Sequence, residues 1–352
     1  VHPQRGRLRG VITTPFEDPP APGEAVEVAD GVLWLQIPLP MVLGHVNAYA
    51  LRDGDGWTLV DTGLDTKKTR AIWETALAGP LSGVPVRRLI VTHHHPDHVG
   101  LAGWFQARGA ELAMTRVAWL TARMLTLDVQ DRPNAETLAF WQSAGMDPET
   151  LAKRAGERPF NFADICTPMP LGFTRLNDGE VIEIGGRRWT IRFGQGHAPD
   201  HATFWAEDDS LVIGGDQLLA TISPNLGVYA TEPEADPVGE WLDSCHALAP
   251  FARDGQLVLP GHKLPYRGLP DRMRQLIDNH DGALDRLRAH LAKGPCTAAQ
   301  CFAPLFKREI DAGTYGLALV EAVAHLNHLH RLGEVSRCKQ ADGAWQWSRV
   351  PD

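Results

Sequence analysis

Apolar and polar residues alternate along two early stretches of the chain, residues 26–40 and 45–63. Each stretch is interrupted by an Asp-Gly pair, which favours a tight turn, so both predict pairs of short β-strands. Residues 66–79 instead carry apolar side chains three and four positions apart, which is helical spacing. The run VRRLIVTH then predicts a buried strand, and HVGLAGWFQARG predicts a helix that ends at Gly109. Strands therefore alternate with helices, as they do in α/β proteins.

The pattern changes at residues 117–158, where three helix-like stretches end at glycine or proline. We interpret this segment as a helical insertion, because strand-like runs and turn pairs resume after residue 173. From about residue 269, amphipathic helices precede a hairpin, and this order indicates a small winged-helix-like module. The chain is thus predicted to contain three parts: an irregular arm at 1–24, a main domain at 25–268 and a C-terminal module at 269–352.

Composition excludes several classes of protein. The 352 residues are 43% hydrophobic, enough for a sizeable core, and the net charge of −9 argues against a broad nucleic-acid-binding face. The five cysteines form no CxxC pair, which is typical of free thiols in a reducing compartment. The sequence shows no apolar run of membrane-spanning length and no apolar segment typical of a secretory leader. We therefore expect a cytoplasmic protein.

Four histidines and an aspartate fall within six residues of the stretch LIVTHHHPDHVG. His93 ends the predicted strand, and His95 can converge with it on one ion. Asp97 and His98 follow in the turn into the next helix and reach a neighbouring position. Imidazoles combined with a carboxylate suit a borderline divalent ion such as zinc. A chance histidine tract would not need the preceding apolar strand, and His94 is expected to point away from the ion.

Four more polar residues follow short apolar runs, where strand ends place functional side chains on loops. They are Asp61 in LVDTG, His197 in GQGH, Asp216 in VIGGD and His262 in LVLPGH. One such residue alone would carry little weight. Four of them, in combination with the His-x-His-x-Asp-His motif, predict a metal site.

This set of motifs resembles that of the metallo-β-lactamase-fold hydrolase superfamily over about residues 26–262. The resemblance implies an α/β protein with an αββα sandwich and two metal ions at one edge of its sheets. The C-terminal helices and hairpin are similar to the winged-helix tail of some members. The implied ligands of the first ion are His93, His95 and His197, and those of the second are Asp97, His98 and His262.

The resemblance also assigns roles to three further residues. Asp216 is implied to bridge the two ions. Asp61 is implied to support the metal-binding loop through hydrogen bonds without binding metal. The stretch GHAPDH offers a second histidine, His201, to which the resemblance gives a supporting role.

The chemistry expected from this site is metal-assisted hydrolysis. Two nearby cations lower the pKa of a bridging water toward about 7, so that hydroxide is available at neutral pH. Asp97 is placed to orient that hydroxide, and no serine or cysteine nucleophile is signalled. The sequence therefore predicts a dinuclear hydrolase, with zinc as the expected metal and manganese or iron as alternatives.

The scissile bond is less constrained. Asp216 argues against a true β-lactamase, because such enzymes usually lack an aspartate at the bridging position. The stretch DQLLA has leucine where related lactonases tend to carry tyrosine, which argues against a lactonase. GGDQLL resembles glyoxalase II-like thioesterases, although the C-terminal helices lack the basic cluster expected for binding glutathione. We favour an ester- or thioester-type substrate. The alternatives are a lactonase and a nuclease or phosphodiesterase whose C-terminal module contacts nucleic acid.

Two segments have open roles at this point. The insertion forms either an apolar lid over the site or its own core, with the candidate residues Trp119, Leu120, Met124, Leu125, Phe140 and Trp141. The C-terminal module offers basic candidates for nucleic acid, Arg331, Arg337, Lys339 and Arg349, but acidic residues line its first helix. We therefore expect a small-molecule substrate, no membrane partner, and a module that serves homo-oligomerisation or walls the active site.

Overall fold

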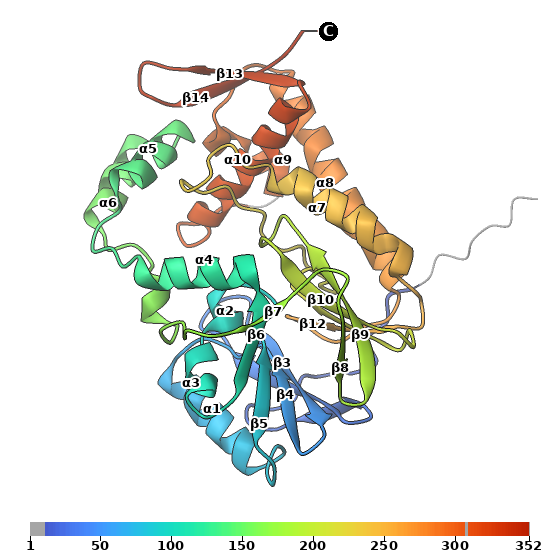
Figure 1. Cartoon of the computed structure of the whole chain (residues 1–352). Coiled ribbons are helices and arrows are strands. Elements are labelled where there is room, and N and C mark those ends of the chain that lie inside the picture. Colours follow the sequence, from blue (N-terminus) through green and yellow to red (C-terminus); the bar gives the residue numbers. More distant parts are fainter. Residues whose placement is uncertain (1–10, 307–308, 352) are drawn as a thin grey trace, which may run out of the picture.

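The computed structural model describes residues 11–306 and 309–351, and most of its strands form two mixed sheets (Figure 1). The seven-stranded sheet runs in chain order, antiparallel from β1 to β4 and parallel from β4 to β7. Its strands are β1 (Val26–Ala29), β2 (Val32–Pro38), β3 (His45–Asp53), β4 (Gly56–Val60), β5 (Val86–Ile90), β6 (Glu111–Thr115) and β7 (Thr174–Leu176).

The five-stranded sheet has the order β12-β11-β10-β9-β8. Only β11 and β12 are parallel in it, and the other neighbours are antiparallel. Its strands are β8 (Val181–Ile184), β9 (Arg187–Gly194), β10 (His201–Ala206), β11 (Leu211–Gly215) and β12 (Leu257–Pro260).

The side chains of β3 show how the two sheets stack. Val46, Ala48 and Ala50 pack with α1 (Lys67–Ala78) and α3 (Ala102–Gln106) on the outer face of the first sheet. The alternate residues Tyr49 and Leu51 pack against the inner face of the second sheet. The outer face of the second sheet is covered by α7 (Pro237–Leu248) and α8 (Leu269–Leu291). The αββα sandwich is therefore confirmed.

The segment after the histidine motif departs from the predicted single helix. It forms α2 (Pro96–Val99) and α3, separated by Gly100 and Leu101. The carbonyl of Gly100 accepts hydrogen bonds from the backbone and hydroxyl of Thr167, and Leu101 N donates to Thr62 Oγ1. Because these groups have tertiary partners, the helical ladder is interrupted. Strand β6 was also not predicted, since its sequence ELAMT lacks the β-branched residues typical of strands apart from its last threonine.

The insertion forms the three expected helices, α4 (Arg116–Leu127), α5 (Ala135–Ser143) and α6 (Pro148–Gly156). Its apolar residues do not form a core of their own. Trp119 stacks on Phe173, whereas Phe140 packs into the same core as α8 and the C-terminal helices. Leu120 and Met124 stay exposed. The insertion thus connects the sandwich to the C-terminal module (Figure 1).

The C-terminal module shares its core with the sandwich. Leu319 and Leu326 pack in the same cluster as Trp241 of α7 and Val258 of β12. The boundary expected at residue 269 stays a prediction, as does the winged-helix assignment. Besides α8, the elements of the module are η3 (Ala298–Cys301), α9 (Phe302–Phe306), α10 (Tyr315–Arg331), β13 (Val335–Lys339) and β14 (Trp345–Arg349). Two short 3-10 helices, η1 (Phe162–Asp164) and η2 (Ala249–Phe251), lie outside the module.

The expected N-terminal arm is described only in part, because residues 1–10 lie outside the described residues. Residues 11–24 contain no helix or extended strand. Thr13 pairs with Arg267, and Phe16 packs edge-on against Trp34. Among the helices of the described ranges, none is both long and apolar enough to cross a membrane.

Two histidines buried between α8 and α10 make the stability of the protein sensitive to acid. The rings of His280 and His325 stack at 5.6 Å. Burial, together with nearby His325 and His328, lowers the pKa of His280 to about 3. Burial, helped by the charges of His328 and Arg286, lowers the pKa of His325 to about 4, although its hydrogen bond to the carbonyl of Glu321 opposes this shift. Both rings are therefore neutral in the folded protein at pH 5, whereas the unfolded chain binds protons below about pH 6.5.

Stability is accordingly expected to fall as the pH drops from about 6.5 toward 4, because only the unfolded state takes up these protons. Each histidine costs about 2 kcal/mol at pH 5, at about 1.4 kcal/mol per pH unit. His280→Leu should remove about half of this acid sensitivity. Urea unfolding of both proteins at pH 7.5 and pH 5 measures the difference. Equal losses of stability in the variant and the wild type would contradict the assignment.

Candidate metal centre

The loops after five strands meet at one edge of the sandwich. Strands β4 and β5 are parallel, as are β11 and β12, so their carboxyl ends point to the same side. The loop between β9 and β10 reaches that edge as well. These loops and the first residues of the elements that follow them carry all of the predicted site residues: Asp61, His93, His95, Asp97, His98, His197, His201, Asp216 and His262.

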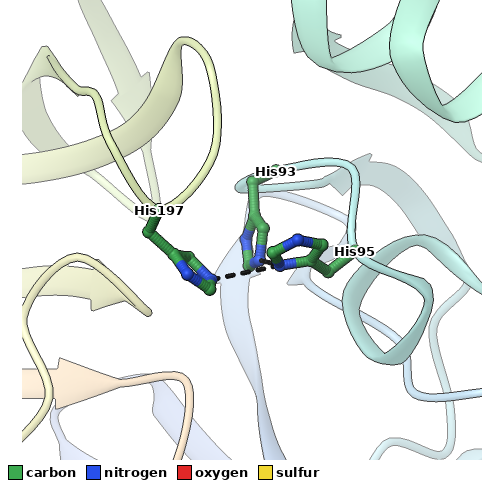
Figure 2. Close-up of side chains that lie close together, drawn as sticks. All are labelled: His93, His95 and His197. Carbon is green, nitrogen blue, oxygen red and sulfur yellow. Dashed lines mark hydrogen bonds between the residues drawn. The ribbon is translucent and has the colours of Figure 1, made fainter. Parts of the chain in front are cut away.

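Three histidines from two distant segments of the chain lie close together. His95 Nδ1 lies 2.9 Å from His93 Nε2 and 3.1 Å from His197 Nε2. Figure 2 shows the three rings converging from two separate loops. Two nitrogens around one tetrahedral zinc ion lie roughly 3.3 Å apart, given zinc–nitrogen bonds of about 2.0–2.1 Å. The three nitrogens therefore fit the expected first ligand set.

Hydrogen bonds behind two of these rings leave the converging nitrogens without a proton. His197 Nδ1 donates to the carbonyl oxygen of Asn225 at 2.9 Å. His93 Nδ1 contacts Thr92 Oγ1 at 3.0 Å, and the hydroxyl of Thr92 itself donates to Asp61. The threonine oxygen must therefore accept from His93. In the neutral form of each ring, Nε2 is then the atom that carries the lone pair a metal ion requires.

A second group joins Asp97, His98 and His262. His262 Nε2 lies 3.3 Å from Asp97 Oδ2, and His98 Nε2 lies 3.7 Å from the same oxygen. His98 Nδ1 donates to Asp61 at 2.8 Å, and His262 Nδ1 donates to the carbonyl oxygen of His45 at 2.7 Å. Both Nε2 atoms consequently face Asp97.

Asp216 lies between the two groups. Its Oδ1 is 3.5 Å from His98 Nε2, whereas its Oδ2 is 3.4 Å from His197 Nε2 and 3.3 Å from His262 Nε2. The backbone leaves little room around it, because a Cβ at Gly261 would collide with Asp216 Oδ1. One carboxylate thus reaches histidines of both groups.

The two groups differ in their electrostatics. Burial, reinforced by neighbouring imidazoles, lowers the pKa of His93 and of His95 well below the usual value. Burial opposes charge on His262 too, but Asp216 and Asp97 outweigh it and raise its pKa to about 10. The pKa of His98 is raised for the same reason. His93 and His95 of the first group are therefore kept neutral, whereas the second group combines imidazoles with carboxylates that favour positive charge.

Buried polar atoms without a hydrogen-bond partner indicate whether metal ions fit between the two groups. His98 Nε2, His262 Nε2 and Asp216 Oδ1 are all buried, and none makes a hydrogen bond to the described part of the chain. Leaving such atoms unpaired is costly, whereas a cation among them would satisfy all three. The ligand atoms of each group also lie within 4.8 Å of one another. The residues present therefore fit divalent metal ions.

Asp61 and His201 lie behind these groups. Asp61 has a left-handed backbone, with φ of 61°, and its carboxylate accepts from Thr92 N, Thr92 Oγ1 and His98 Nδ1. His201 begins β10, stacks on His93 at 4.5 Å and accepts from the backbone N–H of Asp216. His94 stacks on Phe162 and belongs to neither donor group. The structure brings all the proposed ligands together, and their roles stay predictions.

The sequence analysis missed the groups that orient the ligands. Thr92 precedes the histidine motif and could have been noticed there, but the carbonyls of Asn225 and His45 carry no sequence signal. Asn225 is itself held by Glu321 of α10, whose Oε2 accepts from Asn225 Nδ2 at 2.6 Å. The C-terminal module therefore contacts the loop that positions His197.

Comparison with known proteins agrees with this arrangement. A solved β-lactamase domain protein from Burkholderia ambifaria is 37% identical, with a TM-score of 0.88 over 96% of this chain and 98% of that protein. A metallo-β-lactamase family protein from Thermus thermophilus is 29% identical, with a TM-score of 0.76 over 92% of this chain and 100% of that protein.

Two curated relatives are more distant in sequence. The probable metallo-hydrolase YqjP of Bacillus subtilis is 26% identical over 307 residues, 85% of this chain and 92% of that protein. An acyl-coenzyme A thioesterase of Gallus gallus, MBLAC2, is 25% identical over 241 residues, 67% of this chain and 78% of that protein.

Fold, donor groups and relatives define a metal-dependent hydrolase. The sequence model of the metallo-β-lactamase superfamily matches residues 41–289, and that of the metallo-β-lactamase-like C-terminal domain matches residues 284–350. The chain belongs to the metallo-β-lactamase superfamily, as its motifs implied.

Proposed function

We propose that this chain is a dinuclear hydrolase that cleaves the ester or thioester bond of an acyl substrate. The observation that carries the proposal is the position of Asp216, whose two oxygens face His98 on one side and His197 on the other. A carboxylate in this position holds two like-charged ions close together. His93, His95 and His197 would hold one ion, and Asp97, His98 and His262 the other.

When bound, such ions supply a strong nucleophile from water at neutral pH and polarise the carbonyl that is attacked. The residues of the chain do the rest. Asp97 is the more exposed of the two central carboxylates, and the positive charge of His98 and His262 outweighs its burial and keeps its pKa low. It is therefore ionised at neutral pH and can orient the attacking water by accepting a hydrogen bond from it. The ring of His94, stacked on Phe162, walls the site beside His95.

Exposed apolar side chains support an acyl substrate. Leu120, Met124 and Leu127 share one face of α4, since they are four and three residues apart, and all three are exposed. Exposed Phe160 contacts Phe162, the residue that stacks on His94. Phe162 begins η1, which contacts α4, so we propose that this apolar surface receives the acyl chain. The thioesterase named among the relatives also supports this substrate class.

A nuclease or phosphodiesterase is favoured less. Of the basic candidates in the terminal hairpin, Arg337 is paired with Glu234 at 2.6 Å and lies over the ring of Trp345. Phosphate binding would have to break this pair. A lactonase stays an alternative within the ester class.

The experiment is a substrate panel with protein stripped of metal by a chelator and reloaded with zinc. The panel contains thioesters of increasing acyl length, lactones and bis-(p-nitrophenyl) phosphate. We expect zinc-dependent thioester or ester hydrolysis whose kcat/KM rises roughly fourfold per methylene, since each buried CH₂ contributes about 0.8 kcal/mol. Met124→Gln should flatten this dependence.

The matched control is Val181→Thr, because Val181 is a similarly exposed apolar residue on β8, away from α4. It should keep the wild-type dependence on acyl length. Zinc-dependent cleavage of the phosphodiester alone would overturn the proposal. If zinc-dependent ester hydrolysis did not depend on acyl length, the proposed reaction would stand, but the proposed apolar binding surface would be wrong.

A further inference from the structure

A third group of metal-binding side chains lies in the C-terminal module and is built from entirely different elements. His290 is in the last turn of α8, Cys296 precedes η3, and Cys301 ends η3. One ring nitrogen and the two sulfurs lie within 4.8 Å of one another. The two Sγ atoms are 3.4 Å apart. Nothing in the proposed hydrolysis uses this group.

The fold brings the two cysteines together through specific contacts. Cys296 pairs with Trp347 of β14 through two backbone hydrogen bonds, so its position is fixed by the terminal hairpin. Thr297 and Gln300 form a reciprocal capping box that turns the chain into η3. This tight turn carries Cys301 back toward Cys296. The donor atoms are therefore arranged before any ligand binds.

The chemistry of the donors selects the ligand. Two thiolates and one imidazole suit zinc and similar borderline or soft cations, and a set of three leaves one coordination position open. Both sulfurs are buried, whereas His290 is half-buried and lines a surface hollow of about 350 Å³.

The other buried cysteines have no comparable surroundings. These cysteines are Cys166 and Cys245. Among the groups of donor atoms in the described chain, neither is included. The pairing of Cys296 with Cys301 and a histidine is therefore distinctive within this protein.

We propose that His290, Cys296 and Cys301 bind one additional zinc-like divalent cation, separate from the hydrolytic centre. Binding releases the two thiol protons to solvent and replaces them with metal–sulfur bonds. The ion ties the C-terminal end of α8 to the loop that pairs with β14. Its role is to stabilise the module, because none of its ligands touches the strand-end loops.

Cobalt provides a direct test, since thiolate ligands give Co²⁺ an intense near-ultraviolet charge-transfer band. The proposed hydrolytic ligands are nitrogen and oxygen atoms only, so the band would report on this group alone. The full chain, stripped of metal, is titrated with Co²⁺. We expect the band to appear and, once all sites are filled, to reach the intensity of one thiolate-bound Co²⁺ ion per chain. Cys296→Ser and Cys301→Ser should abolish it and lower the zinc content of the protein by one equivalent.

Two further variants keep the test independent of folding. His290→Gln changes a half-buried residue and should weaken Co²⁺ binding and shift the band while leaving circular dichroism unchanged. Cys338→Ser removes an exposed thiol and should have no effect on either. The absence of a band in wild-type protein, or its survival in the Cys296 and Cys301 variants, would overturn the proposal. So would a stable disulfide in zinc-loaded protein, seen as three titratable thiols in place of five.

Discussion

Replacing Asp216 with asparagine is expected to lower kcat/KM by more than about 100-fold. The loss of a residue that merely supports a metal ligand typically costs about 10–100-fold, and Asp216 faces histidines of both donor groups directly. Asparagine has the same shape but no charge, so two nearby cations would repel each other. The metal content of the hydrolytic centre should therefore drop from two equivalents toward one. Steady-state kinetics and metal analysis of the purified variant measure both effects.

The fold should survive this change, because the two sheets pack through apolar side chains that Asp216 does not contact. Circular dichroism and thermal unfolding of the stripped proteins provide that check. Asp243→Asn serves as the control, since it removes a carboxylate from the exposed face of α7. Near-wild-type turnover in the Asp216 variant would show that no carboxylate bridges the ions.

His197→Ala and His201→Ala should have different effects although the two histidines lie in one short stretch. His197 presents an unprotonated Nε2 to His95, so its loss should weaken binding of the first ion by more than about 100-fold. His201 instead accepts a hydrogen bond from the backbone of Asp216. Its loss should weaken metal binding by about 10–100-fold.

Stability should follow the opposite order. His201→Ala leaves the buried N–H of Asp216 without its acceptor, which costs about 1–3 kcal/mol, and opens a cavity beside His93. His197→Ala removes a side chain from the open edge and should change the stability of the metal-free protein less. Zinc titration and urea unfolding of both variants measure the two effects. Equal loss of zinc affinity, or greater loss in the His201 variant, would reverse the assignment.

Patterns between neighbours along the chain predicted much of the fold. Period-two alternation and Asp-Gly turns located the early strands, and Asp236 caps α7 as expected by accepting from Gly239 N. The His-x-His-x-Asp-His motif and the residues after later strands supplied every member of the candidate hydrolytic centre. These features were readable because turn chemistry, capping and the order of strand ends depend on residues close together in sequence.

Contacts between distant segments decided the rest. The broken helix at Gly100 depends on Thr167, and the short strand β6 is held by its neighbours β5 and β7. Phe140 of the insertion packs against the C-terminal helices, which neither expected role for that segment anticipated.

The sequence by itself determined which side chains are the candidate ligands of the proposed centre, since their types and order are visible in it. Only the tertiary structure decided which ring nitrogen each histidine presents. His262 is oriented by the carbonyl of His45, 217 residues away, and His197 by the carbonyl of Asn225. It also decided that His290 meets Cys296 and Cys301. Every residue except proline has the same backbone carbonyl and N–H, so no residue type marks the partner, and only folding determines which ones meet.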